Sequence, residues 1–226
     1  VASVQTPALR AVGNIVTGTD TQTQFIINLN AIPSLLYMLD NPKKNVRKEA
    51  CWTLSNITAG TIEQIQNVIA AGCIPKLVEL LNGTEFDIQK EAVWAISNAT
   101  SGGSAEQIME LARCGCVAPL CNMLKVNDAK VVTVALEGLE NILKAGVEVQ
   151  NSIIVEQIQD CGGIDKIEEL QDHHNEKIYK RAKSILEKYF DADEEYDVDI
   201  QPDLVEGQYQ FGAPQSGGGG GGFNFS

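Results

Sequence analysis

The sequence predicts an all-α solenoid in which a unit of three helices repeats along the chain. A tryptophan and asparagine pair recurs with a step of 42 residues, as Trp52 with Asn56 and as Trp94 with Asn98. Asn14 lies a further 42 residues before Asn56. A period of 40 to 50 residues is typical of stacked helical units, which bury their apolar faces only against neighbouring units.

Each unit is expected to end in a long helix. In residues 46–57, four apolar residues are spaced by four, four and three positions, which places them on one helix face. The pattern recurs in residues 88–99, 131–142 and 178–189. At its centre stands an alanine, whose small side chain allows neighbouring helices to approach closely: Ala50, Ala92, Ala135 and Ala182.

Two shorter helices are expected before each long helix. The middle helix mostly carries a proline near its start, where a missing N–H costs no hydrogen bond: Pro33, Pro75 and Pro119. The first helix is followed by a glycine, which suits a helix C-terminus: Gly72, Gly115 and Gly162. Residues 1–190 therefore contain about four and a half units, the first of them truncated.

Residues 191–226 differ from the rest in composition. They hold eight of the 30 acidic residues and no lysine or arginine, and six glycines follow one another at 217–222. Such a segment buries too little apolar surface to fold alone. We therefore expect a disordered acidic and glycine-rich tail after the repeats at 1–190.

Composition excludes several classes of function. The formal net charge is −13, which argues against binding to nucleic acid, because that would need a basic face. The sequence has no apolar run long enough to cross a membrane and no signal peptide. It has no glycine-rich phosphate loop, no nucleophile motif and no histidine in the units that carry tryptophan. We expect neither an enzyme nor a bound cofactor.

The cysteines do not predict a metal site. Of the six, only Cys114 and Cys116 are close in sequence, and no Cys-x-x-Cys spacing occurs. We expect all six to be buried thiols that act as small apolar side chains in a reducing compartment.

The repeated polar residues predict a groove for a basic peptide. Glu49, Trp52 and Asn56 lie one turn apart on a helix, and Glu91, Trp94 and Asn98 repeat the spacing. Stacked helices would turn the indoles into parallel walls and the asparagines into a row. An asparagine amide can pair with a peptide's main-chain N–H and C=O groups, and indole faces attract lysine and arginine side chains. The alternative, that the tryptophans are core residues, is less consistent with such matched partners.

The motif Glu-Ala-x-Trp-x-x-Ser-Asn, the opening segment from Ala8 to Asp20 and the acidic tail resemble importin-α, the armadillo-repeat adaptor that carries nuclear localisation signals. The similarity covers residues 1–190 and implies the C-terminal portion of that family's fold, a right-handed superhelix. It also implies a function in nuclear import, with the chain shuttling between cytoplasm and nucleus.

The resemblance implies the minor peptide-binding site of the family. The residues that match it are Asn14, Val16, Thr17, Gly18, Asp20, Thr23, Glu49, Trp52, Asn56, Glu91, Trp94 and Asn98. Two departures limit the site, since Arg10 and Glu137 stand where neighbouring units have tryptophan. The resemblance therefore implies one good lysine slot, between Trp52 and Trp94.

Partners are also implied by the resemblance alone. In importin-α an N-terminal segment binds importin-β, and we expect that segment to be missing from this chain. The last repeats and the acidic tail bind a recycling exportin with Ran-GTP and a nucleoporin, for which Asp193, Glu194 and Glu195 are candidates. The alternative is a catenin-like armadillo scaffold, whose groove is basic and takes acidic partners.

Overall fold

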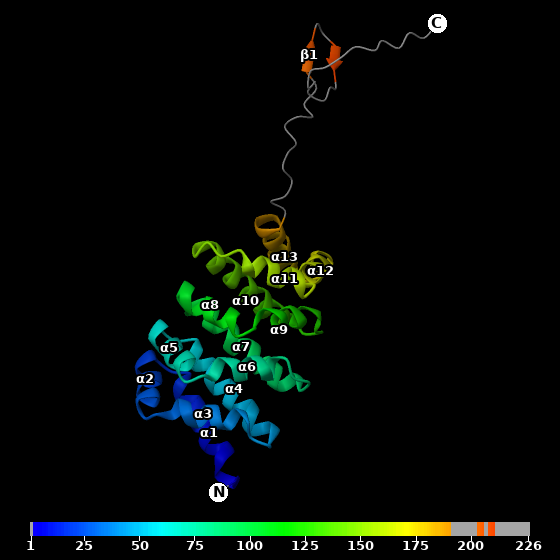
Figure 1. Cartoon of the computed structure of the whole chain (residues 1–226). Coiled ribbons are helices and arrows are strands. Elements are labelled where there is room, and N and C mark those ends of the chain that lie inside the picture. Colours follow the sequence, from blue (N-terminus) through cyan, green and yellow to red (C-terminus); the bar gives the residue numbers. More distant parts are fainter. Residues whose placement is uncertain (1, 191–202, 206–207, 211–226) are drawn as a thin grey trace, which may run out of the picture. The chain divides into compact units, whose positions relative to one another are not determined.

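The computed structural model describes residues 2–190, 203–205 and 208–210. The chain has two parts, Val1–Phe190 and Asp191–Ser226. The N-terminal part is built from helices that follow one another in a stack, as Figure 1 shows by the progression of colour along the sequence. The prediction of an all-α repeat fold is confirmed for this part.

Helix α1 (Ala2–Val16) precedes four units of three helices. The first contains α2 (Asp20–Asn28), α3 (Ala31–Leu39) and α4 (Lys44–Thr58). The second contains α5 (Ile62–Ala70), α6 (Cys73–Leu81) and α7 (Phe86–Gly102). The third contains α8 (Ala105–Arg113), α9 (Val117–Asn122), the 3-10 turn η1 (Met123–Lys125) and α10 (Ala129–Glu148). The fourth contains α11 (Ile153–Asp160), α12 (Gly163–Glu169), the 3-10 turn η2 (Leu170–Asp172) and α13 (Glu176–Tyr189).

The first helices of three units begin with the same reciprocal cap. Thr19, Thr61 and Ser104 each accept a hydrogen bond from the backbone N–H of a glutamine three residues later, whose side chain accepts in return from the cap's N–H. The glutamine also joins the units. Gln107 Nε2 donates to the carbonyl of Ile62 (3.0 Å) in the preceding unit.

Left-handed residues end these first helices. Gly72, Gly115 and Gly162 have φ of 75°, 84° and 63°, as the sequence predicts for glycine in these places. The first unit uses Asn30 instead, with φ 59°. Asparagine tolerates this conformation better than most residues with a side chain, so the turn is kept without glycine.

The core lies between the long helices. Helices α1, α4, α7, α10 and α13 each pack against the next, and the four alanines predicted at their centres are fully buried. Buried hydroxyl groups also join successive long helices. Thr58 Oγ1 donates to the carbonyl of Ala95 (2.9 Å), and Ser97 Oγ donates to that of Val134 (2.8 Å). These contacts fix the spacing between the helices that carry the candidate site.

Ion pairs reinforce the same stacking nearer the surface. Lys44 pairs with Asp87 (3.1 Å) and Lys90 with Asp128 (2.8 Å), so each joins one unit to the next. The hydrogen bond from Lys44 lowers the pKa of Asp87, and that from Lys90 lowers the pKa of Asp128. Among the helices of the described residues, none is long and apolar enough to cross a membrane.

The C-terminal part, Asp191–Ser226, contains two short strands, β1 (Asp203–Val205) and β2 (Gln208–Gln210), which pair antiparallel with Leu204 opposite Tyr209. The sequence analysis expects no regular structure here, so the structure differs at these six residues. The remainder of the predicted tail lies outside the described residues.

Candidate peptide-binding site

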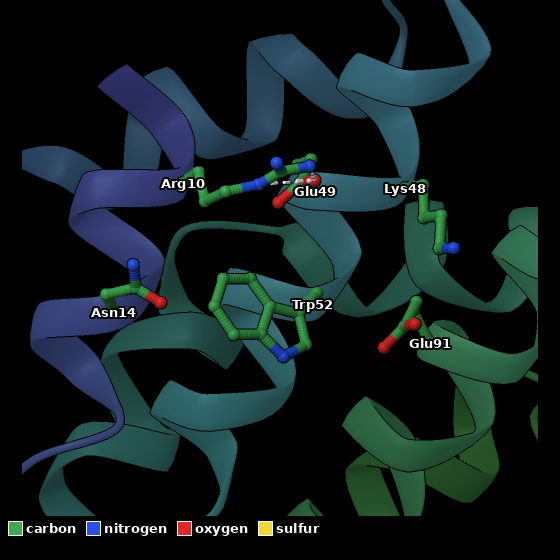
Figure 2. Close-up of a pocket in the computed structure, with 6 residues that line it drawn as sticks. All are labelled: Arg10, Asn14, Lys48, Glu49, Trp52 and Glu91. Carbon is green, nitrogen blue, oxygen red and sulfur yellow. Dashed lines mark hydrogen bonds and ion pairs between the residues drawn. The ribbon is translucent and has the colours of Figure 1, made fainter. Parts of the chain in front are cut away.

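A hollow of about 270 Å³ lies across three of the long helices. Figure 2 shows the Trp52 indole at its centre, on α4, with α1 on one side and α7 on the other. We call this the tryptophan hollow, and it is lined by Arg10, Asn14, Lys48, Glu49, Trp52 and Glu91. The structure thus brings together four of the residues predicted from sequence, which come from three different units.

The position of the Trp52 ring depends on a glycine of α1. A Cβ atom added to Gly13 would lie 2.7 Å from Cε3 of Trp52 and closer still to Cζ3. Only a residue without a side chain allows the indole to rest directly on the α1 backbone. Gly13 stands immediately before Asn14, in the place that Ser55 and Ser97 take in the next two units, so a small residue precedes each of these asparagines.

The charges of the tryptophan hollow are balanced within the protein. Arg10 donates to Glu49 (Nε to Oε1, 3.0 Å) and pairs with it through a second guanidinium nitrogen. The hydrogen bond to Glu49 raises the pKa of Arg10. The Arg10 side chain is 62% exposed whereas that of Glu49 is 14% exposed, so the arginine is the movable partner. The carboxylate predicted to meet a ligand's cation therefore already has one.

Glu91 is the second carboxylate of the tryptophan hollow. Its burial raises its pKa above the ordinary carboxyl value, and the positive charges of Lys48 and Lys90 act in the opposite direction. In Figure 2, Lys48 and Glu91 lie on the side of the indole away from Asn14. A cation entering here would restore part of the solvation that Glu91 loses by burial.

A second hollow, of about 160 Å³, lies where α1 ends. We call it the loop hollow, and it is lined by Val16, Thr17, Gly18, Asp20, Thr23, Asn56, Ala59 and Gly60. All five loop residues predicted from sequence are in it, together with Asn56 from α4. Thr23 Oγ1 donates to the carbonyl of Val16 (3.3 Å), and Gln64 Nε2 to that of Asp20 (2.8 Å). These bonds fix the loop against the first helices of two units.

The asparagines of the predicted row differ in what they already bond. Asn98 Nδ2 donates to the carbonyl of Ser55 (3.0 Å), and Asn141 Nδ2 donates to Ser101 Oγ (3.1 Å), so both amides join neighbouring units. Asn56 is different, because its Nδ2 is buried and finds no hydrogen-bond partner in the described part of the chain. A buried unpaired amide donor is costly, by about 1–3 kcal/mol, unless a ligand accepts its hydrogen bond.

The row of indoles ends after Trp94. Trp94, on α7, is 39% exposed. Beyond it Glu137, on α10, pairs with Arg181 of α13, which also lies 3.3 Å from Glu140. The third unit therefore presents an ion pair, formed with the fourth, where the two earlier units present indoles.

Sequence reasoning missed four residues that line or shape these hollows. Gly13, Lys48, Ala59 and Gly60 were not predicted. Lys48 stands four residues before Trp52 and so on the same helix face, which is a signal that could have found it. Asp193, Glu194 and Glu195, predicted for exportin or nucleoporin binding, lie outside the described residues.

The cysteines only partly match the expectation of buried thiols. Four of the six are buried: Cys51, Cys73, Cys116 and Cys121. The other two are half-buried, Cys114 in the third unit and Cys161 in the fourth. Within the described part of the chain, the side chains of His, Cys, Asp and Glu form no group of three or more that could hold a metal ion.

Models of known protein families match four successive segments of this chain. The family described as armadillo/beta-catenin-like repeat matches residues 19–59, 61–101 and 104–144, and the family described as atypical Arm repeat matches residues 152–203. A solved designed armadillo repeat protein in complex with peptide (KR)4 superimposes with a TM-score of 0.75 at 35% identity, over 84% of this chain and 77% of that one. A second designed armadillo repeat protein gives 0.73 at 33% identity, over 81% and 75%.

The curated relatives narrow the family. Importin subunit alpha-1b of Oryza sativa subsp. japonica is 52% identical over 99% of this chain and 43% of its own length, and importin subunit alpha-3 of Arabidopsis thaliana is 48% identical over 93% and 41%. The chain thus spans about two fifths of the length of these relatives. It belongs to the armadillo-repeat family, and the curated relatives named here are importin alpha subunits.

Proposed function

We propose that this chain is the cargo-binding part of a nuclear import adaptor, and that it binds extended Lys/Arg-rich nuclear localisation peptides along α1, α4 and α7. The observation that carries the proposal is the pair of adjoining hollows, which place an indole, two carboxylates and an unpaired amide on one surface. The importin subunit alpha relatives support the adaptor function. The designed armadillo protein in complex with peptide (KR)4 supports the ligand class.

Asn56 would hold the peptide's main chain. Its Nδ2 has no partner among the residues that the structure describes, so a peptide carbonyl can accept its hydrogen bond without breaking another bond there. Asn98 has used one N–H on Ser55, but its Oδ1 remains able to accept from a peptide N–H. These two amides lie on successive long helices, about 8–10 Å apart for packed helices, which is the length of roughly three extended residues.

The loop hollow would take a lysine ammonium group. It lies at the C-terminal end of α1, and the C-terminus of a helix carries partial negative charge. Val16, Thr23 and Asp20 are in its lining, and they carry a backbone carbonyl, a hydroxyl and a carboxylate. An ammonium group has three donors and no acceptor, so it matches a set of oxygen acceptors.

The tryptophan hollow would take the next basic side chain. Its apolar stem can lie against the Trp52 ring, and the attraction of a cation to the ring contributes about 0.5–2 kcal/mol. The charged head would reach Glu91 and Glu49, the second of which pairs with Arg10 in the free protein. The ligand's cation must therefore displace Arg10, and we expect binding by this chain alone to be weak.

The same proposal extends to the whole adaptor. We infer that it shuttles between cytoplasm and nucleus, with importin-β, a recycling exportin with Ran-GTP and a nucleoporin as partners. These inferences rest on the relationship to importin subunit alpha and not on a surface of the described residues.

A binding measurement tests the peptide site. We would measure the fluorescence anisotropy of a labelled Lys/Arg-rich peptide with the wild-type chain and with Trp52→Ala/Trp94→Ala, at low and high salt. We expect a dissociation constant in the micromolar range or weaker (about −8 kcal/mol at 1 μM), a higher value at high salt, and loss of binding in the double variant.

The controls separate this proposal from its competitor. A peptide of the same length in which glutamate replaces each basic residue should not bind. Tighter binding of the acidic peptide would support the catenin-like scaffold instead. Equal binding by wild-type and double variant, with both folded by circular dichroism, would show that the indoles are structural.

A further inference from the structure

We propose that Cys121 and Cys161 form a modification site, a pair of thiols that hydrogen peroxide oxidises to a disulfide. Cys121 lies on α9 of the third unit, and Cys161 ends α11 of the fourth. The site lies away from both hollows described above and does not depend on the proposed peptide function.

The two cysteines are held near one another by Lys166. Its Nζ donates to the carbonyl of Cys161 (3.1 Å) and to Oδ1 of Asn122 (3.0 Å), the residue next to Cys121. The Cys161 thiol donates to the carbonyl of Ile158 (3.3 Å). Burial raises the pKa of Cys121, and the nearby Cys161 thiol raises it further. Gly163 makes the approach possible, since a Cβ atom at that position would lie 2.7 Å from the sulfur of Cys121. The turn that follows Cys161 can therefore close directly on α9, which brings the sulfurs of two units together.

The surroundings give an oxidant access to one thiol only. Cys121 is fully buried, whereas Cys161 is half-buried and lines a hollow of about 310 Å³ between α9 and α11. Gln157 lines the same hollow, and its Oε1 is buried without a hydrogen-bond partner. Asp160 adds a carboxylate. Both groups accept hydrogen bonds, and hydrogen peroxide can donate two.

The reaction follows from this asymmetry. The sulfur of Cys161 attacks one oxygen of hydrogen peroxide, the O–O bond breaks, and the other oxygen leaves as water with the thiol's proton. The sulfenic acid formed on Cys161 is then attacked by the sulfur of Cys121, the S–O bond breaks, and a second water leaves with the remaining proton. Two thiols lose two electrons and two protons, and one peroxide is reduced to two waters.

The disulfide would link two residues 40 positions apart in the chain, with η1, α10 and α11 between them. Such a link stabilises a protein mainly by restricting its unfolded state. It would tie α11 and α12 to the third unit, so the fourth unit should detach less readily. The melting temperature of the oxidised chain should then exceed that of the reduced chain.

Thiol counting after oxidation tests the proposal. The full reduced chain is treated with hydrogen peroxide, quenched with catalase, denatured and alkylated, and its peptides are analysed by mass spectrometry without reduction. We expect four alkylated cysteines, the six of the chain minus the two in the disulfide, and one peptide that links Cys121 to Cys161. Reduction should restore six.

Three variants sharpen the result. Cys161→Ser should leave Cys121 alkylatable, and Cys121→Ala should leave Cys161 as a sulfenic or sulfinic acid without a link. Cys114→Ser is the matched control, because Cys114 is the other half-buried cysteine, and the link should still form in it. If Cys121→Ala does not fold, the half-buried Cys161→Ser decides alone. Six alkylated cysteines in the oxidised wild type, or a link between Cys114 and Cys116 instead, would overturn the assignment.

Discussion

The contact between Gly13 and the Trp52 ring gives a sharp prediction for peptide binding. In Gly13→Ala the new methyl group would overlap Cε3 and Cζ3 of the indole, so the ring must leave its place on α1. Overpacking of this kind costs about 1–3 kcal/mol, while alanine gains about 1 kcal/mol over glycine within a helix. The free energy of unfolding should therefore fall by no more than about 2 kcal/mol, and the protein should remain folded.

Peptide binding should respond more than stability does. Displacing the ring removes the wall against which a basic side chain would lie, and the loss of a cation–π contact of about 0.5–2 kcal/mol weakens affinity by roughly 2- to 30-fold. Anisotropy of a labelled Lys/Arg-rich peptide measures the affinity, and a urea melt measures the stability.

The matched control is Gly138→Ala, another helical glycine, whose Cβ would come no closer than 3.3 Å to a neighbouring atom, Ser97 Oγ. It should change peptide affinity little. Unchanged affinity in Gly13→Ala, together with an unchanged tryptophan emission spectrum, would refute the argument that Gly13 positions the indole.

Three further predictions concern the same surface. Asn98→Ala should lower the free energy of unfolding by about 0.5–1.5 kcal/mol in a urea melt, because it removes the hydrogen bond to Ser55. Asn56→Ala should weaken peptide binding with little loss of stability. A larger loss of stability in Asn56→Ala than in Asn98→Ala would contradict the assignment. Burial raises the pKa of Glu91, so its contribution to stability is present below the ordinary carboxyl pKa and is lost as pH rises through the raised value. Glu91→Gln should therefore have a higher melting temperature than wild type at pH 7 and should bind the basic peptide more weakly. A lower melting temperature would contradict this reasoning. Arg10→Ala should tighten peptide binding at low salt by about two- to tenfold, because it frees Glu49. An exposed ion pair of this kind contributes only about 0–1 kcal/mol to stability, so the variant should remain folded. Weaker peptide binding would show that Arg10 contacts the peptide.

Periodicity made most of the fold predictable. The apolar spacing around Ala50 and its equivalents predicts the long helices, and the glycines at 72, 115 and 162 mark turns that the structure places at positive φ. Asn30 shows why one such turn was harder to find, since its residue type signals the conformation less strongly than glycine does. The paired strands at 203–205 and 208–210 were not predicted because the surrounding composition is that of a disordered segment.

Several residues that line the two hollows were predicted from the sequence, but their internal bonds were not, and the predicted Trp94 and Asn98 line neither hollow. The recurring Trp, Asn and Glu positions place Trp52, Glu49 and Glu91 around one hollow, as the spacing indicates. A single sequence could not show that Arg10 already pairs with Glu49, because the two residues belong to different units and meet only when α1 packs on α4. The unpaired amide of Asn56 is likewise a property of packing and not of spacing.

The most direct test of the account is to observe the two indoles while a peptide binds. Their N–H signals can be followed by ¹⁵N NMR and assigned with Trp52→Phe and Trp94→Phe. We predict that both signals shift and saturate with the same dissociation constant as an unlabelled Lys/Arg-rich peptide is added, and that a glutamate-substituted peptide leaves them unchanged. Binding of the basic peptide by anisotropy with neither indole signal moving would contradict the claim that these helices form the peptide groove.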